Sequence, residues 1–295
     1  MDTVVLTGAT SGLGGQLVTL LRGQNVPVVA LVRSSAGMSA ARALGAEPVM
    51  ADLDDLTSLP DGVAGTMVHA AGVRFAQAAR ILAEKWGVSA GVCISSASAT
   101  VPGHPLSELV ASHEQALLSS DVRWHMIRPT MIFGWSRDRN VRKLARLILS
   151  APAVPRLRGG GRIQPVFVDD VAAAAVELAT RASAGDNVLP PVVPYGGLRP
   201  MRVGDLVEDL RVELGVRRLP VSVPVALLSR AAHTTRLDRT GRFGHAVSML
   251  TTSRVVPDPT AVGLSHQPTD WSTALRIAVG RYGMARSPQS PGSDM

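Results

Sequence analysis

The sequence predicts an α/β protein in which a doubly wound parallel sheet is followed by a smaller C-terminal lobe. Short apolar runs rich in β-branched residues alternate with helix-like segments over residues 3–180, which is the pattern of parallel strand–helix units. The first run, over 4–6, enters a glycine-rich turn and then a helix-like segment. The chain has 295 residues, enough to bury a full α/β core and to form a second lobe.

The glycine-rich turn after the first strand is typical of a Rossmann dinucleotide site. Gly8 permits the tight turn, Gly12 lets a pyrophosphate approach the backbone, and Gly14 lets the helix pack close to the strand. The start of this helix offers free N–H groups and the positive end of its dipole to phosphates. The cofactor contacts predicted here are Gly8, Thr10, Ser11, Gly12, Leu13 and Gly14.

The second strand, over 27–32, ends at Arg33 and Ser34, about 20 positions beyond the glycines. An acid at this place would bond the 2′-hydroxyl of NAD, whereas an arginine suits the 2′-phosphate of NADP. The residues therefore favour NADP(H), and the alternative is a solvated arginine at a strand end. A helix over 39–44 and a third strand over 47–51 follow, and that strand ends at Asp52 and Leu53, which are placed to flank the adenine.

Residues 65–72 form a fourth strand and the loop after it. In this loop Ala70, Ala71 and Gly72 are small, so the backbone can lie against the cofactor. A helix over 75–86 and a fifth strand over 91–96 come next. Because ligands of a parallel sheet bind at the carboxyl ends of its strands, we expect these loops to line one site.

The patterning weakens towards the C-terminus. Asp170 is expected to cap a helix over 171–180, because an aspartate at a helix start satisfies free N–H groups. An amphipathic helix is predicted over 203–214 and a last helix over 271–282. The expected organisation is a cofactor-binding core over 1–180, a mostly substrate-binding lobe over 181–285 whose final helix packs on the core, and a disordered tail over 286–295.

These motifs resemble those of the short-chain dehydrogenase/reductase family, in its extended or atypical, epimerase-like branch. The glycine spacing itself is that of the single-domain branch, so the branch rests on the later motifs. By this resemblance, Pro129, Thr130 and Ile132 contact the nicotinamide end of the cofactor. The matching stretches are residues 7–14 (TGATSGLG), 52–53 (DL), 68–72 (VHAAG), 94–96 (ISS), 121–134 (DVRWHMIRPTMIFG) and 166–171 (VFVDDV).

Members of the family usually protonate the substrate oxygen with a tyrosine whose pKa is lowered by a lysine four residues later. The chain contains two tyrosines, Tyr195 and Tyr282, and neither is followed by a lysine at that spacing. Counting along the motifs places the tyrosine position at Leu106 and the lysine position at Val110. The usual acid–base pair is therefore absent, and an apolar pocket for a flat polycyclic substrate is expected instead. The predicted substrate-binding residues are Leu106, Val110, Phe133 and Trp135.

Other polar groups could partly replace the missing pair. Ser98 takes the position of the family's third polar residue, which bonds the carbonyl, and Ser95 or Ser96 would take it in a shifted register. A serine can orient a carbonyl and bridge a water, but it is a poor acid, and these serines could instead simply finish a strand and loop. His104 and His113 could donate protons near neutral pH, or could be packed or solvent-facing.

Two classes of function follow. In the first, the protein is an NADPH-dependent ketoreductase that resembles tailoring enzymes of aromatic polyketide pathways lacking the tyrosine–lysine pair, and its substrate or a water supplies the proton. A positioned general acid contributes roughly 10²–10⁴-fold, so its loss weakens catalysis without abolishing it. In the second, the protein binds NADP(H) as a redox sensor without turnover. An ordinary epimerase or dehydratase is disfavoured, because those reactions need the tyrosine as a base.

The composition limits which cellular compartment and which binding partners are expected. The formal charge is +7, but the arginines are scattered and lack interleaved aromatics, so nucleic-acid binding is not expected. There is no basic-then-apolar leader and no apolar run of the ~20 residues needed to span a bilayer, which predicts a cytoplasmic protein without membrane contact. The single cysteine, Cys93, lies in an apolar run and is expected to be buried and inert, with no metal site. The oligomeric state stays open.

Overall fold

The computed structural model describes residues 1–101, 106–218, 220–226, 255–256 and 263–284. The chain forms two compact units that interleave in the sequence. The first comprises Met1–Thr130, Val166–Gly196 and Val256–Pro268, and the second comprises Met131–Pro165, Gly197–Val255 and Thr269–Met295. This division differs from the single boundary expected at residue 180, because residues 131–165 leave the first unit and residues 256–268 return to it.

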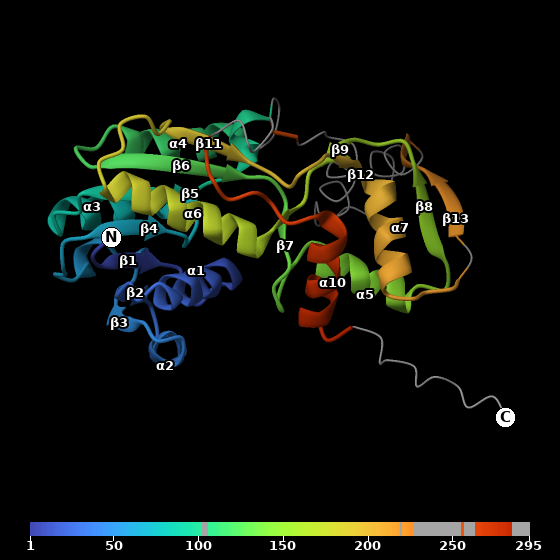
Figure 1. Ribbon diagram of the computed structural model, residues 1–295, viewed down its shortest axis with the longest axis horizontal. Helices are drawn as coiled ribbons and strands as arrows, with labels where there is room; N and C mark the ends of the chain where they lie inside the picture. Colours follow the sequence, from blue (N-terminus) through green and yellow to red (C-terminus); the bar gives the residue numbers. More distant parts are fainter. Residues whose placement is uncertain (102–105, 219, 227–254, 257–262, 285–295) are drawn as a thin grey trace. The chain divides into compact units, whose positions relative to one another are not determined.

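The first unit is built on a seven-stranded sheet in the order β11-β6-β5-β4-β1-β2-β3 (Figure 1). Every neighbouring pair in this sheet is parallel. The predicted α/β class with a doubly wound parallel sheet is confirmed. The strands are β1 (Val4–Thr7), β2 (Val28–Val32), β3 (Glu47–Met50), β4 (Thr66–His69), β5 (Ala90–Ile94), β6 (Arg123–Pro129) and β11 (Val192–Tyr195).

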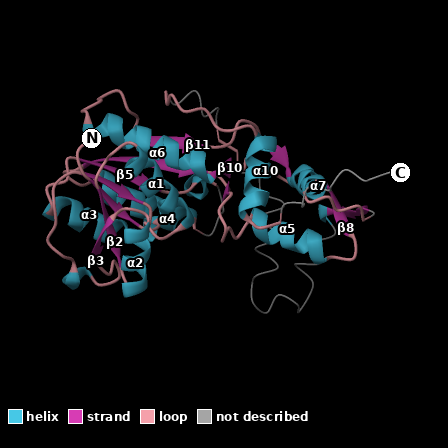
Figure 2. Cartoon of the chain, turned by 60° about the horizontal axis from the view of Figure 1, so that its bottom comes forward, coloured by secondary structure: helices cyan, strands magenta, loops and turns pink. Residues whose placement is uncertain are grey.

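Helices enclose the strands of this sheet (Figure 2). Helices α1 and α6 pack against each other, and α6 also packs on β4, β5 and β6. Helices α3 and α4 pack together and close an apolar core that contains Met67, Trp86, Leu117 and Met126. The helices are α1 (Gly12–Gly23), α2 (Ser35–Ala43), α3 (Ala76–Lys85), α4 (Ser107–Leu118) and α6 (Val168–Ser183), with the short 3-10 helices η1 (Leu56–Ser58), η2 (Val73–Phe75) and η3 (Ala97–Thr100).

Two helix starts differ from the sequence expectation. The helix predicted over 39–44 begins at Ser35, because the Ser34 side chain accepts a hydrogen bond from the Gly37 N–H at 3.1 Å and caps it. The prediction that Asp170 caps a helix beginning at 171 is wrong, since α6 begins at Val168. The buried face of α6 starts with Val168, one turn earlier than predicted, and Asp170 lies in the first turn, near the positive end of the helix dipole.

The second unit contains α5 (Val141–Ser150), α7 (Val203–Glu213) and α10 (Trp271–Arg281). Helix α7 packs on α5, on α10 and on β8 (Val154–Arg158), which pairs in parallel with β13 (Pro220–Pro224). Strands β9 (Arg162–Ile163) and β12 (Met201–Arg202) form an antiparallel pair. The helix predicted over 203–214 is confirmed as α7. The last predicted helix is α10, but it packs on α7 within this unit, whereas we expected it on the cofactor-binding core.

Cys93 lies inside the sheet with no exposed surface, and burial raises the pKa of its thiol, as expected of an inert cysteine. None of the helices described is both long and apolar enough to cross a membrane. Within the same residues, no three metal-ligating side chains cluster together. The tail predicted over 286–295 lies outside the described residues.

Candidate functional site

A pocket of about 320 Å³ lies at the carboxyl ends of β1, β2, β3 and β4. Neighbouring strands β1 and β4 mark the point where the strand order reverses, which is where ligands bind in open α/β sheets. Eight of the predicted cofactor contacts line this pocket: Gly8, Thr10, Ser11, Arg33, Asp52, Leu53, Ala70 and Ala71. The sequence reasoning missed six other lining residues: Leu31, Val32, Ala51, Asp54, Arg74 and Phe75.

The turn between β1 and α1 requires glycine at two positions. Gly8 has φ +75°, and a Cβ atom there would lie 2.7 Å from the backbone of Ala70. A Cβ atom on Gly14 would lie 2.0 Å from the carbonyl oxygen of Gly8. The Ser11 hydroxyl caps α1 by accepting from the Gly14 N–H at 2.9 Å. The first turn of α1 is thereby held against β1, with its N-terminus beside the pocket.

Two arginines line the pocket, and both are exposed. Arg33 directly follows β2, and the guanidinium carbon of Arg74 lies 4.2 Å from the centre of the Phe75 ring, a cation–π distance. On the opposite loop, a carboxylate oxygen of Asp52 accepts from the Asp54 N–H at 3.0 Å and shapes the turn after β3. The signal for Arg74 was its place two residues after Gly72, in the loop already expected to meet the cofactor.

His69, at the end of β4, links the two loops that flank this pocket. Its Nδ1 lies 2.8 Å from the Thr7 hydroxyl, and its Nε2 lies 3.0 Å from the carbonyl oxygen of Gly72. The Thr7 hydroxyl also accepts from the N–H groups of Ala70 and Ala71, at 3.2 Å and 3.3 Å. Burial lowers the pKa of His69 to about 4, so the ring is neutral at neutral pH.

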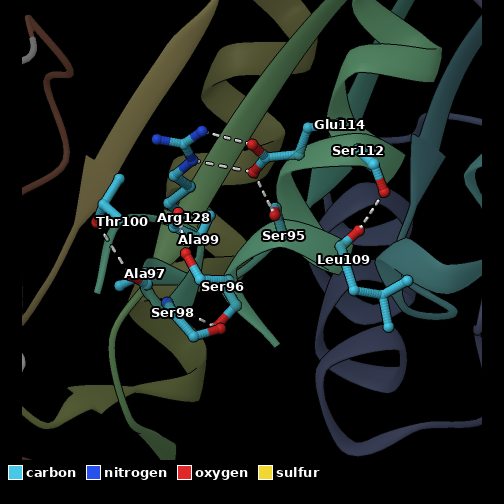
Figure 3. Close-up of polar contacts among 11 residues, drawn as sticks. Ser95, Ser96, Ala97, Ser98, Ala99, Thr100, Leu109, Ser112, Glu114 and Arg128 are labelled. Carbon is cyan, nitrogen blue, oxygen red and sulfur yellow. Dashed lines mark hydrogen bonds and ion pairs between the residues drawn. The ribbon is translucent and has the colours of Figure 1, made fainter. Parts of the chain in front are cut away.

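The serines after β5 are not equivalent (Figure 3). Ser95 donates to the carboxylate of Glu114, and Arg128 binds the same carboxylate through Nε at 2.9 Å and Nη2 at 2.5 Å. Glu114 is 2% exposed, so its carboxylate is buried beneath the partly exposed Ser95 and Arg128. The Ser95 hydroxyl therefore donates its hydrogen to Glu114 and cannot also donate it to a ligand. The Glu114–Arg128 pair was missed, although an acid within the apolar stripe of α4 was visible in the sequence.

Ser96 and Ser98 form a second, separate pair (Figure 3). The Ser96 hydroxyl accepts from the Ser98 N–H at 3.2 Å, and the two hydroxyl oxygens lie 2.8 Å apart. A single hydrogen lies between the two oxygens, so the pair retains one further hydroxyl hydrogen that it can donate. Both serines are partly exposed. This pair, rather than Ser95, is therefore the arrangement that suits binding of a carbonyl oxygen.

Leu106 and Val110 do not share one environment. Leu106, at the start of α4, is 49% exposed, whereas Val110 is 7% exposed and lies on the buried face with Glu114 and Leu117. Leu106 can thus offer apolar surface to a ligand, and Val110 offers little. His113 is partly buried, and its Nδ1 has no partner among the described residues. His104 lies outside the described residues.

Gly12, Leu13 and Gly14 lie in α1 and Ser34 caps α2, and none of them lines the pocket. The predicted contacts after residue 128 belong to the end of β6 and to the second unit. Pro129 ends β6, and the Thr130 N–H donates to the carbonyl oxygen of Tyr195 at 2.9 Å. Ile132 and Phe133 form the short strand β7 of the second unit. Phe133 is 1% exposed and packs on Trp271 with ring centres 5.2 Å apart, so its side chain belongs to the interior of that unit. Trp135 is only partly buried.

Neither tyrosine resembles an activated acid. Tyr195 is fully buried, and burial raises its pKa, with Asp170 and Glu177 adding to the effect. Tyr282 donates its hydroxyl to Asp138 at 2.5 Å, and burial again raises its pKa. A raised pKa keeps each phenol protonated, which is opposite to the shift that a catalytic tyrosine requires.

No protein-family model matches the chain. One curated relative, the 4-hydroxy-2-methyl-3-oxo-4-farnesyl-3,4-dihydroquinoline-1-oxide ketoreductase of Stigmatella aurantiaca, is 30% identical over 125 residues. The aligned stretch spans 37% of this chain and 37% of that relative.

Solved structures resemble the chain over nearly its whole length. The crystal structure of gox2253 superposes with a TM-score of 0.73 and 20% identity, covering 96% of this chain and 98% of the other. The UDP-glucose 4-epimerase of Thermotoga maritima, solved with UDP-glucose, gives a TM-score of 0.69 and 17% identity, covering 96% and 99%. WbmH of Bordetella bronchiseptica, solved with NAD+, gives 0.68 and 15%, covering 96% and 99%. At these identities the likeness establishes the α/β Rossmann-type fold.

Proposed function

We propose that the protein is an NADPH-dependent ketoreductase that reduces a ketone of a bulky polycyclic aromatic compound, of the angucyclinone type, to an alcohol. The observation that carries the proposal is the pocket at the point of strand reversal, where the β1 turn, Arg33 and the small-residue loop after β4 meet. The partial relative is a ketoreductase, and WbmH, which has the same fold, binds NAD+. Both support a nicotinamide dinucleotide and carbonyl chemistry.

The residues of the pocket fit this cofactor. Gly8 and Ser11 form the turn at the start of α1, where a pyrophosphate is stabilised by N–H groups and the helix dipole. Arg33 and Arg74 supply positive charge that suits a 2′-phosphate, and Asp52 and Leu53, which line the same pocket, would flank the adenine. When bound, the nicotinamide ring supplies the hydride.

The protein's own part in the reduction is to bind and orient the ketone. The Ser96–Ser98 pair can donate one hydrogen bond to the carbonyl oxygen, and Leu106 can offer an apolar surface to the rings. A hydroxyl of the substrate beside the ketone, or a water molecule, supplies the proton that the missing tyrosine would otherwise give. This route avoids most of the roughly 10²–10⁴-fold loss that the absence of a general acid entails.

A second candidate, an NADP(H)-binding redox sensor without turnover, is favoured by one observation. Both tyrosines are buried with raised pKa values, and positions 106 and 110 carry no acid or base. Such a protein would use the same pocket but would signal to a partner instead of reducing a ketone.

The deciding experiment follows NADPH oxidation with a panel of polycyclic hydroxyketones, with a nucleotide sugar as the control substrate. Turnover of any hydroxyketone supports the reductase and removes the sensor. Tight NADPH binding with no turnover across the panel favours the sensor. If the protein binds neither NADPH nor NADH, both proposals are wrong.

A further inference from the structure

His69 is a buried residue that does not line the pocket, yet its ring contacts both loops that do. It has no exposed surface. One ring nitrogen is within hydrogen-bond distance of Thr7, the last residue of β1, and the other is within hydrogen-bond distance of Gly72, which follows His69 by 3 residues in the sequence. The hydrogen bonds of this ring therefore join the Gly8 turn to the loop that leads from Ala70 to Phe75.

The contacts determine where the hydrogens lie. The carbonyl oxygen of Gly72 can only accept, so Nε2 of His69 carries the ring hydrogen. Nδ1 then accepts from the Thr7 hydroxyl, whose two lone pairs face the N–H groups of Ala70 and Ala71. The Thr7 hydroxyl therefore donates one hydrogen bond, to His69, and accepts two, from Ala70 and Ala71. Only one arrangement of the hydrogens satisfies all of these contacts.

The hydrogen bond from His69 to Gly72 lies at the start of the segment that carries Arg74 and Phe75, which line the pocket. Gly72 has φ +105°, a conformation that favours glycine, and the chain turns there into η2. Arg74 and Phe75, the next residues that line the pocket, lie in η2. Opposite them, a Cβ atom on Gly8 would already be only 2.7 Å from the Ala70–Ala71 peptide. Small displacements of this loop would therefore change the width of the pocket.

We propose that His69 is a positioning residue for the dinucleotide pocket: its neutral ring, with the hydrogen on Nε2, holds the 70–75 loop at the distance from the β1 turn that the cofactor requires. This inference rests on the proposed function, since it assumes that the pocket takes a nicotinamide dinucleotide. His69 itself touches no part of the bound molecule and acts through Thr7 and Gly72.

Two substitutions separate the two bonds of the ring. His69→Asn places an amide oxygen near Nδ1 and keeps the acceptor for Thr7, but it loses the bond to Gly72. His69→Gln places an amide nitrogen near Nε2 and keeps the donor to Gly72, but it loses the acceptor for Thr7. Thr7→Val removes the hydroxyl, so the Ala71 N–H loses this hydrogen-bond acceptor. Thr7→Ser preserves the hydroxyl. The matched control is His125→Gln, because His125 is 3% exposed in the same sheet and bonds Pro190 instead.

The affinity for NADPH is measured by fluorescence titration, together with the melting temperature and the KM and kcat of any turnover. We expect about three- to tenfold weaker NADPH binding in Thr7→Val and in both His69 variants, the effect of one misplaced hydrogen bond, with a raised KM and little change in kcat. Thr7→Ser should bind as the wild type does. His125→Gln should lower the melting temperature without weakening NADPH binding.

The outcomes are distinguishable. If the wild type binds NADPH and the Thr7→Val and His69 variants bind it within twofold of that affinity, the positioning role is wrong while the proposed function stands. If affinity falls only in proportion to lost stability, as strongly in His125→Gln as in His69→Gln, the role is merely structural and the inference also fails. If the wild type binds no dinucleotide, it is the proposed function that fails.

Discussion

At the scale of single residues, charge and protonation decide what the pocket can hold. Arg33 and Arg74 bring two guanidinium groups to the pocket, and Asp52 and Asp54 bring two carboxylates to it from the loop after β3. His69, which does not line the pocket, is kept neutral by burial.

Replacing Arg33 with Asp should weaken NADPH binding by about 10- to 100-fold and change NADH binding little. The reason is that repulsion replaces a charge-assisted hydrogen bond, which is worth about 1.5–3 kcal/mol. Titrating both cofactors by fluorescence gives the ratio. Arg42→Asp is the control, since Arg42 is exposed in the last turn of α2 and does not line the pocket. If Arg33→Asp kept the wild-type ratio of NADPH affinity to NADH affinity, another residue would bind the 2′-phosphate. Arg74 would then be tested next.

The neutral His69 should make folding stability depend on pH. Burial lowers its pKa from 6.5 to about 4, so the unfolded chain binds a proton that the folded chain refuses. The free energy of unfolding therefore keeps its full value above pH 6.5. It falls by about 3 kcal/mol in all as the pH drops from 6.5 towards 4. Urea unfolding of wild type and His69→Gln across this window isolates the effect, because other titrating groups are shared. Parallel pH curves for the two proteins would contradict the prediction.

At the scale of elements, β1 and α1 approach so closely that a single methyl group is excluded. Gly14→Ala should cost about 3 kcal/mol, because its Cβ atom would lie 2.0 Å from the Gly8 carbonyl oxygen and α1 would have to shift. Gly15→Ala is the matched control in the same helix, where the nearest atom is the Leu44 Cδ1 at 3.9 Å. It should be neutral or stabilising, because alanine is the better helix former. Equal melting temperatures for the two variants would refute the close packing.

The proposed protonation of the ketone by the substrate can be tested at the short helix η3, which carries Ser98. If no side chain donates the proton, Ser98→Ala should cost only a hydrogen bond, about 0.5–1.5 kcal/mol or roughly tenfold in rate. Methylating the substrate hydroxyl beside the ketone should cost far more, on the order of 10²–10⁴. Steady-state kinetics of both enzymes with both substrates provide the comparison.

Two controls accompany this experiment. Ser112→Ala removes an exposed serine of α4 that bonds the carbonyl oxygen of Leu109 at 2.9 Å, and it should not affect the rate (Figure 3). Binding of the methylated compound must also be shown to be intact, since the methyl group adds bulk. A loss above a thousandfold in Ser98→Ala, with the methylated substrate still reduced, would exclude protonation by the substrate.

At the scale of the whole molecule, residues far apart in the sequence complete each unit. In the second unit, the Tyr282 hydroxyl reaches Asp138 across 144 positions, and Arg281 donates to the Gly134 carbonyl oxygen at 3.1 Å. In the first unit, Glu177 accepts from the N–H groups of Ser265 and His266 at 2.6 Å and 3.0 Å. These contacts return the end of the chain to segments that precede it by more than 80 residues.

Tyr282→Phe should lower the free energy of unfolding by about 1–3 kcal/mol, because Asp138 is 3% exposed and would lose a donor inside the protein. Thermal denaturation measures the loss. Arg276→Ala, on the exposed side of α10, is the control and should have little effect. A melting temperature equal to that of the wild type would show that the bond between Tyr282 and Asp138 does not stabilise α10.

The sequence by itself determined the alternation of strands and helices, the glycine turn and the place of Arg33 at a strand end. These features depend on periodicity and spacing over a few residues, which a chain carries wherever it folds. It also established the absence of the tyrosine–lysine pair, because neither tyrosine is followed by a lysine four residues later, and this needs no structure to be seen.

Only the tertiary structure decided which side chains meet inside the protein. Glu114 with Arg128 and Ser95, Thr7 with His69, and Phe133 with Trp271 are brought together by the packing of whole faces. The same packing moved residues 131–165 and α10 into the second unit. Burial makes an unpaired polar group costly, which favours the partners that Glu114 and His69 find on neighbouring elements. That choice depends on contacts between distant segments, which local patterns do not encode.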